Sequence, residues 1–169
     1  MQKLAFGNTF TKNTTMETIK EKQIPCKLIM LIDDSSIDNF VNQRVVLRYG
    51  FSENVIAFTK TRQGLQYLLK INTDTCEEEI PSFIFLDLNM PEIDGFEFLA
   101  AFSLLSDLIK NKMKIVVLTS SINPADVEVC KKYPSVLTFL HKPLVKSNLD
   151  AVELMLQSNS NGMLTAIGA

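Results

Sequence analysis

Residues 82–88 read SFIFLDL, a nearly unbroken apolar run that contains one acidic residue close to its end. A run of this kind is typical of a central parallel strand, because such a strand is buried on both faces of its sheet. Four further short apolar runs predict strands at 27–32, 54–58, 114–119 and 136–140. Segments with apolar residues at helical spacing alternate with these runs and predict helices at 36–49, 61–71, 94–108, 124–133 and 145–157.

The alternation of five strands with five helices predicts an α/β fold built from parallel βαβ units. The crossovers should be right-handed, and helices should cover both faces of the sheet. In open sheets of this class, ligands bind outside the carboxyl ends of the strands. The residues that end or follow the strands are therefore the first candidates for a functional site.

Length and composition allow one domain with its own core, since the chain has 169 residues and 46% of them are hydrophobic. We expect this domain at 27–157, between a flexible N-terminal extension at 1–26 and a loose C-terminal tail at 158–169. A net charge of -2 disfavours direct binding of nucleic acid, and no apolar run is long enough for insertion into a membrane. The three cysteines form no C-x-x-C pair, which favours a reducing, cytoplasmic location.

Polar residues stand at the ends of four predicted strands. Asp33 and Asp34 follow the first strand, and Asp87 lies at the end of the third. Thr119 ends the fourth strand, and Lys142 follows the fifth. Because parallel strands share one carboxyl edge, we expect three carboxylates, a hydroxyl and an ammonium group to meet there. An unpaired acid at the end of a buried strand is costly, so Asp87 is the strongest candidate.

These residue types indicate phosphoryl chemistry. Three crowded carboxylates repel one another and need a cation, and oxygen ligands favour a hard ion such as Mg²⁺, with Mn²⁺ as an alternative. An aspartate carboxylate can accept a phosphoryl group covalently. Lys142 could then pair with one phosphoryl oxygen, and the hydroxyl of Thr119 could donate a hydrogen bond to another. Catalysis of this kind rests on positioning and charge neutralisation.

The same residues also allow plainer interpretations. Asp33 and Asp34 could cap the helix that follows them, and Thr119 could simply end a strand. The only histidine, His141, should point away from the acids, which favours a structural role. The Asp94-Gly95 pair is interpreted as a turn and the entry to a helix.

Four motifs stand at the predicted strand ends, namely IDDS at 32–35, FLDLNMPEIDG at 85–95, LTSS at 118–121 and FLHKP at 139–143. In order and spacing they resemble the receiver domain of two-component response regulators, of the single-domain type found in chemotaxis. The resemblance covers roughly residues 27–157. It implies a flavodoxin-like, doubly wound parallel sheet of five strands in the order 2-1-3-4-5, with helices on both faces.

Carried over to this chain, the resemblance implies that Asp87 is the phospho-acceptor. Asp34 and Asp87 would bind Mg²⁺ directly, together with the main-chain carbonyl of Asn89, while Asp33 would act through a bound water. Lys142 would contact the phosphoryl group.

The resemblance also implies a switch. Thr119 would be the hydroxyl that moves toward the phosphoryl group, and Phe139 the aromatic residue that turns inward. The peptide bond between Lys142 and Pro143 would be cis, which would aim the lysine at the site.

The function implied is that of a stand-alone response regulator rather than an enzyme in the ordinary sense. A histidine kinase or a histidine phosphotransfer protein would supply the phosphoryl group. No output domain is expected after residue 157, so a downstream protein would read the state of the fourth predicted helix, fifth strand and fifth helix. Limited self-phosphorylation and autophosphatase chemistry would follow.

Two other functions fit some of the same residues. A receiver-like binding module would work without phosphorylation, but such modules often lose an acid or the lysine, and here all are present. An aspartyl-phosphate phosphohydrolase would need a second acid two residues after the nucleophile, where this chain has Asn89.

Overall fold

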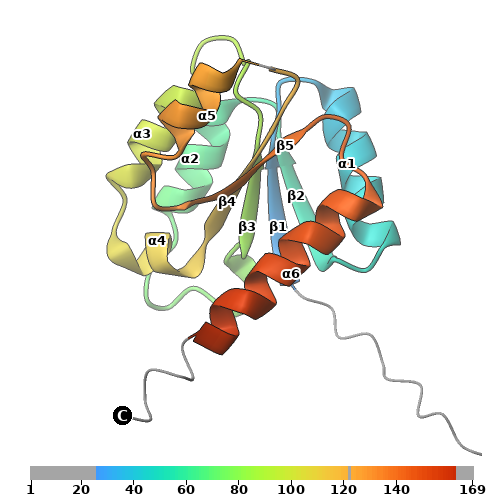
Figure 1. Cartoon of the computed structure of the whole chain (residues 1–169). Coiled ribbons are helices and arrows are strands. Elements are labelled where there is room, and N and C mark those ends of the chain that lie inside the picture. Colours follow the sequence, from blue (N-terminus) through green and yellow to red (C-terminus); the bar gives the residue numbers. More distant parts are fainter. Residues whose placement is uncertain (1–25, 122, 163–169) are drawn as a thin grey trace, which may run out of the picture.

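The computed structural model describes residues 26–121 and 123–162 (Figure 1). The flexible extension predicted at 1–26 lies outside them except for Cys26, as do residues 163–169 of the predicted tail. The strands are β1 (Cys26–Ile32), β2 (Ser52–Phe58), β3 (Phe83–Leu86), β4 (Lys114–Thr119) and β5 (Val136–His141). The helices are α1 (Ser36–Arg48), α2 (Thr61–Leu69), α3 (Gly95–Ser103), α4 (Asp107–Lys112), α5 (Pro124–Cys130) and α6 (Lys146–Gly162), with a 3₁₀ turn, η1 (Glu77–Glu79), before β3.

The five strands form one parallel sheet in the order β2-β1-β3-β4-β5, which confirms the predicted topology. In the register, Ile32 lies beside Leu86, and Leu86 lies beside Val117. The carboxyl ends of β1, β3 and β4 therefore reach the same edge of the sheet. The residues that follow these strands are held close together although they are far apart in the sequence.

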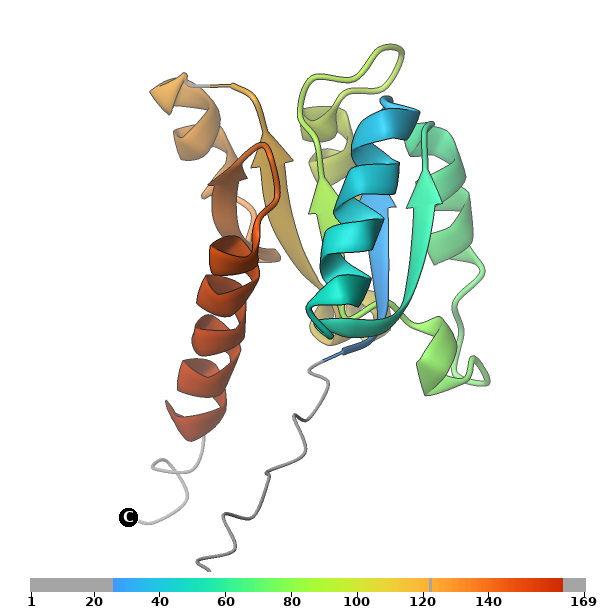
Figure 2. The same ribbon diagram turned by 90° about the vertical axis from the view of Figure 1, so that its right-hand side faces the viewer.

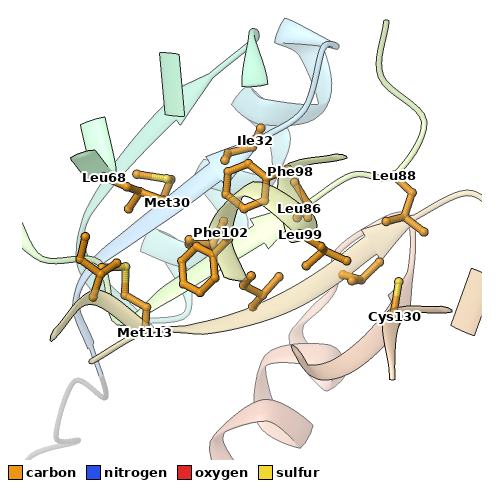
Figure 3. Packing of buried hydrophobic residues seen from close by; sticks show 14 of the residues in the cluster. Met30, Ile32, Leu68, Leu86, Leu88, Phe98, Leu99, Phe102, Met113 and Cys130 are labelled. Carbon is orange, nitrogen blue, oxygen red and sulfur yellow. The ribbon is translucent and has the colours of Figure 1, made fainter. Parts of the chain in front are cut away.

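Two layers of helices enclose the sheet (Figures 1 and 2). On one face, Leu68 of α2, Phe98 of α3 and Ile84 of β3 belong to the larger buried cluster, part of which is drawn in Figure 3. On the other face, Val46 of α1 and Val152 of α6 belong to a second cluster. Both faces of β3 are thus covered, which explains the unbroken apolar character of its sequence.

Local capping explains where three helices begin. The side chain of Ser35 accepts the N–H of Asp38 at the start of α1. Asp94 and Glu97 form a reciprocal capping box at the start of α3. At α5, Asn123 caps a helix whose first residue is proline, as its sequence predicts.

The predicted helix at 94–108 is wrong, because the structure has two helices there. α3 ends at Ser103, whose hydroxyl donates to the carbonyl of Ala100, and α4 starts at Asp107. The change of direction leaves Leu104 almost fully exposed and brings Ile109 of α4 into the core. Apolar spacing continues through the break, so it gives no signal there. The predicted fourth and fifth helices are therefore α5 and α6.

Two helix ends also differ from the prediction. α5 ends at Cys130 rather than at residue 133, because Tyr133 closes a turn by donating its N–H to Cys130. α6 continues to Gly162, five residues beyond the predicted end. Within the described ranges, no helix is long and apolar enough to cross a membrane.

Candidate functional site

Asp33 and Asp34 lie at the carboxyl end of β1. The N–H of Asp33 donates to the carbonyl of Phe58 at 3.1 Å, which continues the pairing of β1 with β2 for one residue. Asp33 is only 4% exposed, and its side chain accepts the N–H of Ser35 at 2.9 Å. Asp34 is exposed. The two neighbouring acids therefore offer one buried and one accessible carboxylate.

Asp87 follows β3, and both its main chain and its carboxylate are held by hydrogen bonds. Its N–H donates to the carbonyl of Ile32 at 2.9 Å. Its Oδ1 atom accepts the N–H of Leu88 at 2.7 Å and that of Asn89 at 3.4 Å. Its Oδ2 atom accepts a hydrogen bond from Lys142 at 2.8 Å. Asp87 is 5% exposed, so a fixed carboxylate lies just below the surface.

The three acids form a compact oxygen cluster. One carboxylate oxygen from each of Asp33, Asp34 and Asp87 lies within 4.8 Å of the others. Carboxylate oxygens at this spacing fit a hard divalent cation, which needs several oxygen ligands and keeps some of its waters. The exposure of Asp34 leaves one side of the cluster open to solvent.

Lys142 lies where the prediction expects a cation. Its N–H donates to the carbonyl of Thr119, and the peptide bond that joins it to Pro143 is cis. Its Nζ atom lies 2.6 Å from Asp33 Oδ2, 2.8 Å from Asp87 Oδ2 and 3.0 Å from Asp38 Oδ2. The lysine is thus paired with three carboxylates at once.

Burial and neighbouring charges shift the pKa values of Asp33 and Lys142. Burial raises the pKa of Asp33, against the opposing effects of the Lys142 ammonium group and the N–H of Ser35. Burial alone would lower the pKa of Lys142, but its hydrogen bonds to Asp33, Asp87 and Asp38 outweigh this effect and raise it. Lys142 therefore stays charged at neutral pH and offsets part of the repulsion among the acids.

Thr119 ends β4 and is fully buried. Its hydroxyl accepts the N–H of Ser121 at 3.2 Å. The hydroxyl of Ser121 in turn donates to Asp126 in the first turn of α5 at 2.5 Å. Thr119 is thus linked to the start of α5 by two consecutive hydrogen bonds.

Phe139 and His141 lie on one side of β5. Phe139 is half-buried and packs against the core cluster that contains Phe98. The exposed ring of His141 lies edge-on to Phe139, with ring centroids 6.3 Å apart. The prediction that His141 points away from the acids agrees with this arrangement.

Two residues near the site were missed by the sequence interpretation. Asp38 reaches Lys142 from the first turn of α1, and Gly95 packs against the main chain of Asp87. The Ser35-x-x-Asp38 pattern indicates a helix start. It does not indicate a contact with a lysine 104 residues away.

The hollows of the described surface include one at each end of the sheet. The larger, about 380 Å³, lies between Phe102, Lys114 and Tyr133, near the amino end of β4. A smaller one of about 270 Å³ has Asp34 at its margin, with Lys60 and nearby loop residues. Of these two hollows, the one at Asp34 adjoins the acidic cluster.

Comparison with known proteins identifies a family whose fold agrees with the sheet and the acidic cluster described above. The response regulator receiver domain family matches residues 29–152. The response regulator Rcp1 of Synechocystis is 32% identical over 111 residues, which cover 64% of this chain and 72% of Rcp1. A structure of Rcp1 in its Mn²⁺-bound form has a TM-score of 0.56 and 29% identity, and covers 72% of this chain and 85% of that one.

Two further solved structures have similar folds. A two-component response regulator from Cytophaga hutchinsonii has a TM-score of 0.66 and 26% identity, with 79% of this chain and 96% of that chain covered. The phosphorylated cyanobacterial phytochrome response regulator RcpA has a TM-score of 0.58 and 25% identity, with 74% and 86% covered. With an acidic cluster at the carboxyl edge of a 2-1-3-4-5 sheet and a family match over residues 29–152, the chain belongs to the response regulator receiver domain family.

Proposed function

We propose that Asp87 accepts a phosphoryl group from a phosphohistidine on a histidine kinase or a histidine phosphotransfer protein. The observation that carries this proposal is the way the Asp87 carboxylate is held. One oxygen is fixed by main-chain N–H groups and the other is paired with Lys142, beside two further acids. A fixed nucleophile with a cation next to it suits a reaction that depends on positioning and charge neutralisation.

In the transfer, a carboxylate oxygen of Asp87 forms a bond to phosphorus while the bond from phosphorus to the imidazole nitrogen breaks. The imidazole leaves with the electron pair of that bond. Lys142 pairs with one phosphoryl oxygen as charge moves onto the acceptor. In hydrolysis, a water oxygen forms a bond to phosphorus while the bond from phosphorus to the Asp87 oxygen breaks, which releases inorganic phosphate and returns the carboxylate. This gives the limited autophosphatase chemistry of a signalling protein.

We propose Mg²⁺ as the ion of this site, with Mn²⁺ as a substitute. Asp34, Asp87 and the main-chain carbonyl of Asn89 would bind it directly, and Asp33 would act through a water. A bound ion would neutralise the charge that gathers on the acceptor and the phosphoryl oxygens. The spacing of the three carboxylates supports this assignment, as does the Mn²⁺-bound form of Rcp1.

The output is proposed to be a change in protein–protein contacts. Thr119 would exchange the N–H of Ser121 for a phosphoryl oxygen, and Phe139 would move from its half-buried position into the core. Because Thr119 is linked to α5 and Phe139 lies on β5, the affected face would be that of α5, β5 and α6. The three free cysteines support action in a reducing compartment.

The acceptor is tested by exposing the protein to acetyl phosphate or a phosphohistidine donor with Mg²⁺ and measuring its intact mass. The wild type should gain one phosphoryl group, and Asp87→Asn should gain none. Asp107→Asn removes an exposed acid on α4 and should label like the wild type. Label that persists in Asp87→Asn would refute the assignment.

The output is tested by capture of partner proteins with and without beryllofluoride, which mimics an acyl phosphate. Capture that depends on beryllofluoride in the wild type, and not in Asp87→Asn, is expected. Equal capture under both conditions would indicate a binding module that works without phosphorylation.

A further inference from the structure

Lys142 divides its contacts between two kinds of carboxylate. Asp33 and Asp87, at 2.6 and 2.8 Å, are members of the acidic cluster. Asp38, at 3.0 Å, lies outside that cluster. Asp34 completes the cluster and makes no ion pair with Lys142 among the described residues. Asp38 is therefore an anionic partner of Lys142 that is not one of the three acids expected to hold a metal ion.

Lys142 and a divalent ion would compete for the same two carboxylates. An ion held by the cluster draws on Asp33 and Asp87, whose Oδ2 atoms now pair with the ammonium group. It also brings a second positive charge toward Lys142, and like charges at short range in a partly buried site repel strongly. Binding of the ion is therefore opposed by the lysine, unless the lysine keeps another negative partner.

The position of Asp38 is well suited to that role. Asp38 lies in the first turn of α1, where its N–H donates to the Ser35 hydroxyl at 3.1 Å and fixes the turn. Its side chain is 43% exposed, whereas that of Lys142 is 16% exposed, so Asp38 lies at the solvent side of the pair. A negative charge at this end of a helix is also favoured by the helix dipole.

We propose that Asp38 is a positioning residue that retains Lys142 when a divalent cation binds to the acidic cluster, and so raises the affinity of the cluster for the cation. The proposal deepens the proposed function and rests on its metal site. Asp38 itself ligates neither the ion nor the phosphoryl group. It acts through Lys142 by keeping the ammonium group neutralised at the edge of the site.

The test is a titration with Mn²⁺, followed by the electron paramagnetic resonance signal of the free ion and repeated with Mg²⁺ as competitor. Asp38→Asn should raise the Kd for Mn²⁺ by about fivefold, the size expected for the loss of one favourable ion pair. Asp38→Glu keeps the charge and should recover most of the affinity. Far-UV circular dichroism and thermal unfolding check that each variant is folded.

Glu92→Gln is the matched control for loss of charge. Glu92 is an exposed acid beside the hollow at Asp34. Among the described residues, the ion-pair partners of Lys142 are Asp33, Asp38 and Asp87. Removal of the Glu92 charge should change the Kd by less than about twofold, because exposed charges are screened by solvent and salt. A loss equal to that of Asp38→Asn would overturn the proposal.

A double variant separates action through Lys142 from a plain charge effect. In a Lys142→Met background, Asp38→Asn should weaken Mn²⁺ binding no more than Glu92→Gln does in the wild type. A full loss in that background would overturn the role assigned to Asp38. If wild-type protein binds and labels while Asp38→Asn binds Mn²⁺ equally well, only this inference fails. If the wild type binds no Mn²⁺, the proposed metal site fails with it.

Discussion

Gly95, the first residue of α3, lies directly against the main chain of Asp87. A β-carbon at Gly95 would come within 2.5 Å of the Asp87 carbonyl oxygen and 2.7 Å of the Leu88 Cα atom. The N–H of Gly95 donates to the carbonyl of Leu88 at 3.0 Å. Only a residue without a side chain fits such a close approach of two backbone segments. The entry of α3 therefore sets the position of the acceptor.

Gly95→Ala should accordingly destabilise the protein by about 2–3 kcal/mol, since backbone atoms must move to admit the methyl group. Urea denaturation measures the change. Gly64→Ala is the matched control, because its added carbon meets side chains rather than main chain, the nearest atom being the end of the Ile32 side chain at 2.8 Å, and alanine favours the helix. The control should lose less than about 1 kcal/mol. Equal losses in the two variants would contradict a backbone clash at Asp87.

Glu92 is in a conformation that side chains rarely adopt. Its φ of 68° lies in the left-handed region, and Ile93 donates its N–H to Pro91 across it in a three-residue turn. Glycine adopts this conformation without the steric cost, so Glu92→Gly should stabilise the protein by about 1 kcal/mol. Thermal unfolding measures this, and Glu92→Gln, which keeps the β-carbon, should leave stability nearly unchanged. A destabilised Glu92→Gly variant would show that strain at this turn is small.

The parallel sheet and most of the acidic site could be predicted from the residues for one physical reason, whereas the strand order was predicted from the resemblance to the receiver family. Acids at the end of buried strands are costly, and parallel strands bring their carboxyl ends to one edge. The positions of Asp33, Asp34 and Asp87 at strand ends thus predicted that the three acids lie together at the carboxyl edge of the sheet. The register between Ile32 and Leu86 then brings them together.

The features that were not predicted depend on contacts between distant segments. Asp38 meets Lys142 only because α1 and the residue after β5 reach the same edge, and no local pattern records that contact. The apolar spacing continues through the break between α3 and α4, so the sequence does not reveal the break. The change of direction is seen only in the folded structure, where it buries Ile109. Gly95 was interpreted as a helix entry, which is correct, but its contact with Asp87 needs the packed structure.

Asp34→Asn should raise stability in the absence of divalent ions. Asp34 adds negative charge to the cluster and makes no ion pair with Lys142 among the described residues, so its neutralisation relieves repulsion without loss of a partner. A gain of up to about 1 kcal/mol corresponds to a rise in Tm of about 2–4 °C. Differential scanning calorimetry in the presence of a chelator measures it.

In the presence of Mg²⁺, the wild type should become more stable than Asp34→Asn. At an Mg²⁺ concentration about one hundred times Kd, binding stabilises the wild type by about 2.7 kcal/mol. Asp34→Asn loses a proposed ligand and should gain much less. The same Mg²⁺-induced rise in Tm in both proteins would exclude Asp34 as a ligand.

Thr119→Val should separate phosphoryl acceptance from its readout. The variant removes the hydroxyl that accepts the N–H of Ser121, so it should cost about 1–2 kcal/mol and break the chain of hydrogen bonds to Asp126. Asp87 keeps its own contacts and should still take a phosphoryl group, though more slowly. Amide NMR shifts of Ser121 and Asp126 on addition of beryllofluoride should be large in the wild type and in Thr119→Ser, which retains a hydroxyl, and small in Thr119→Val. Equal shifts in all three proteins would mean that the signal reaches α5 without the hydroxyl of Thr119.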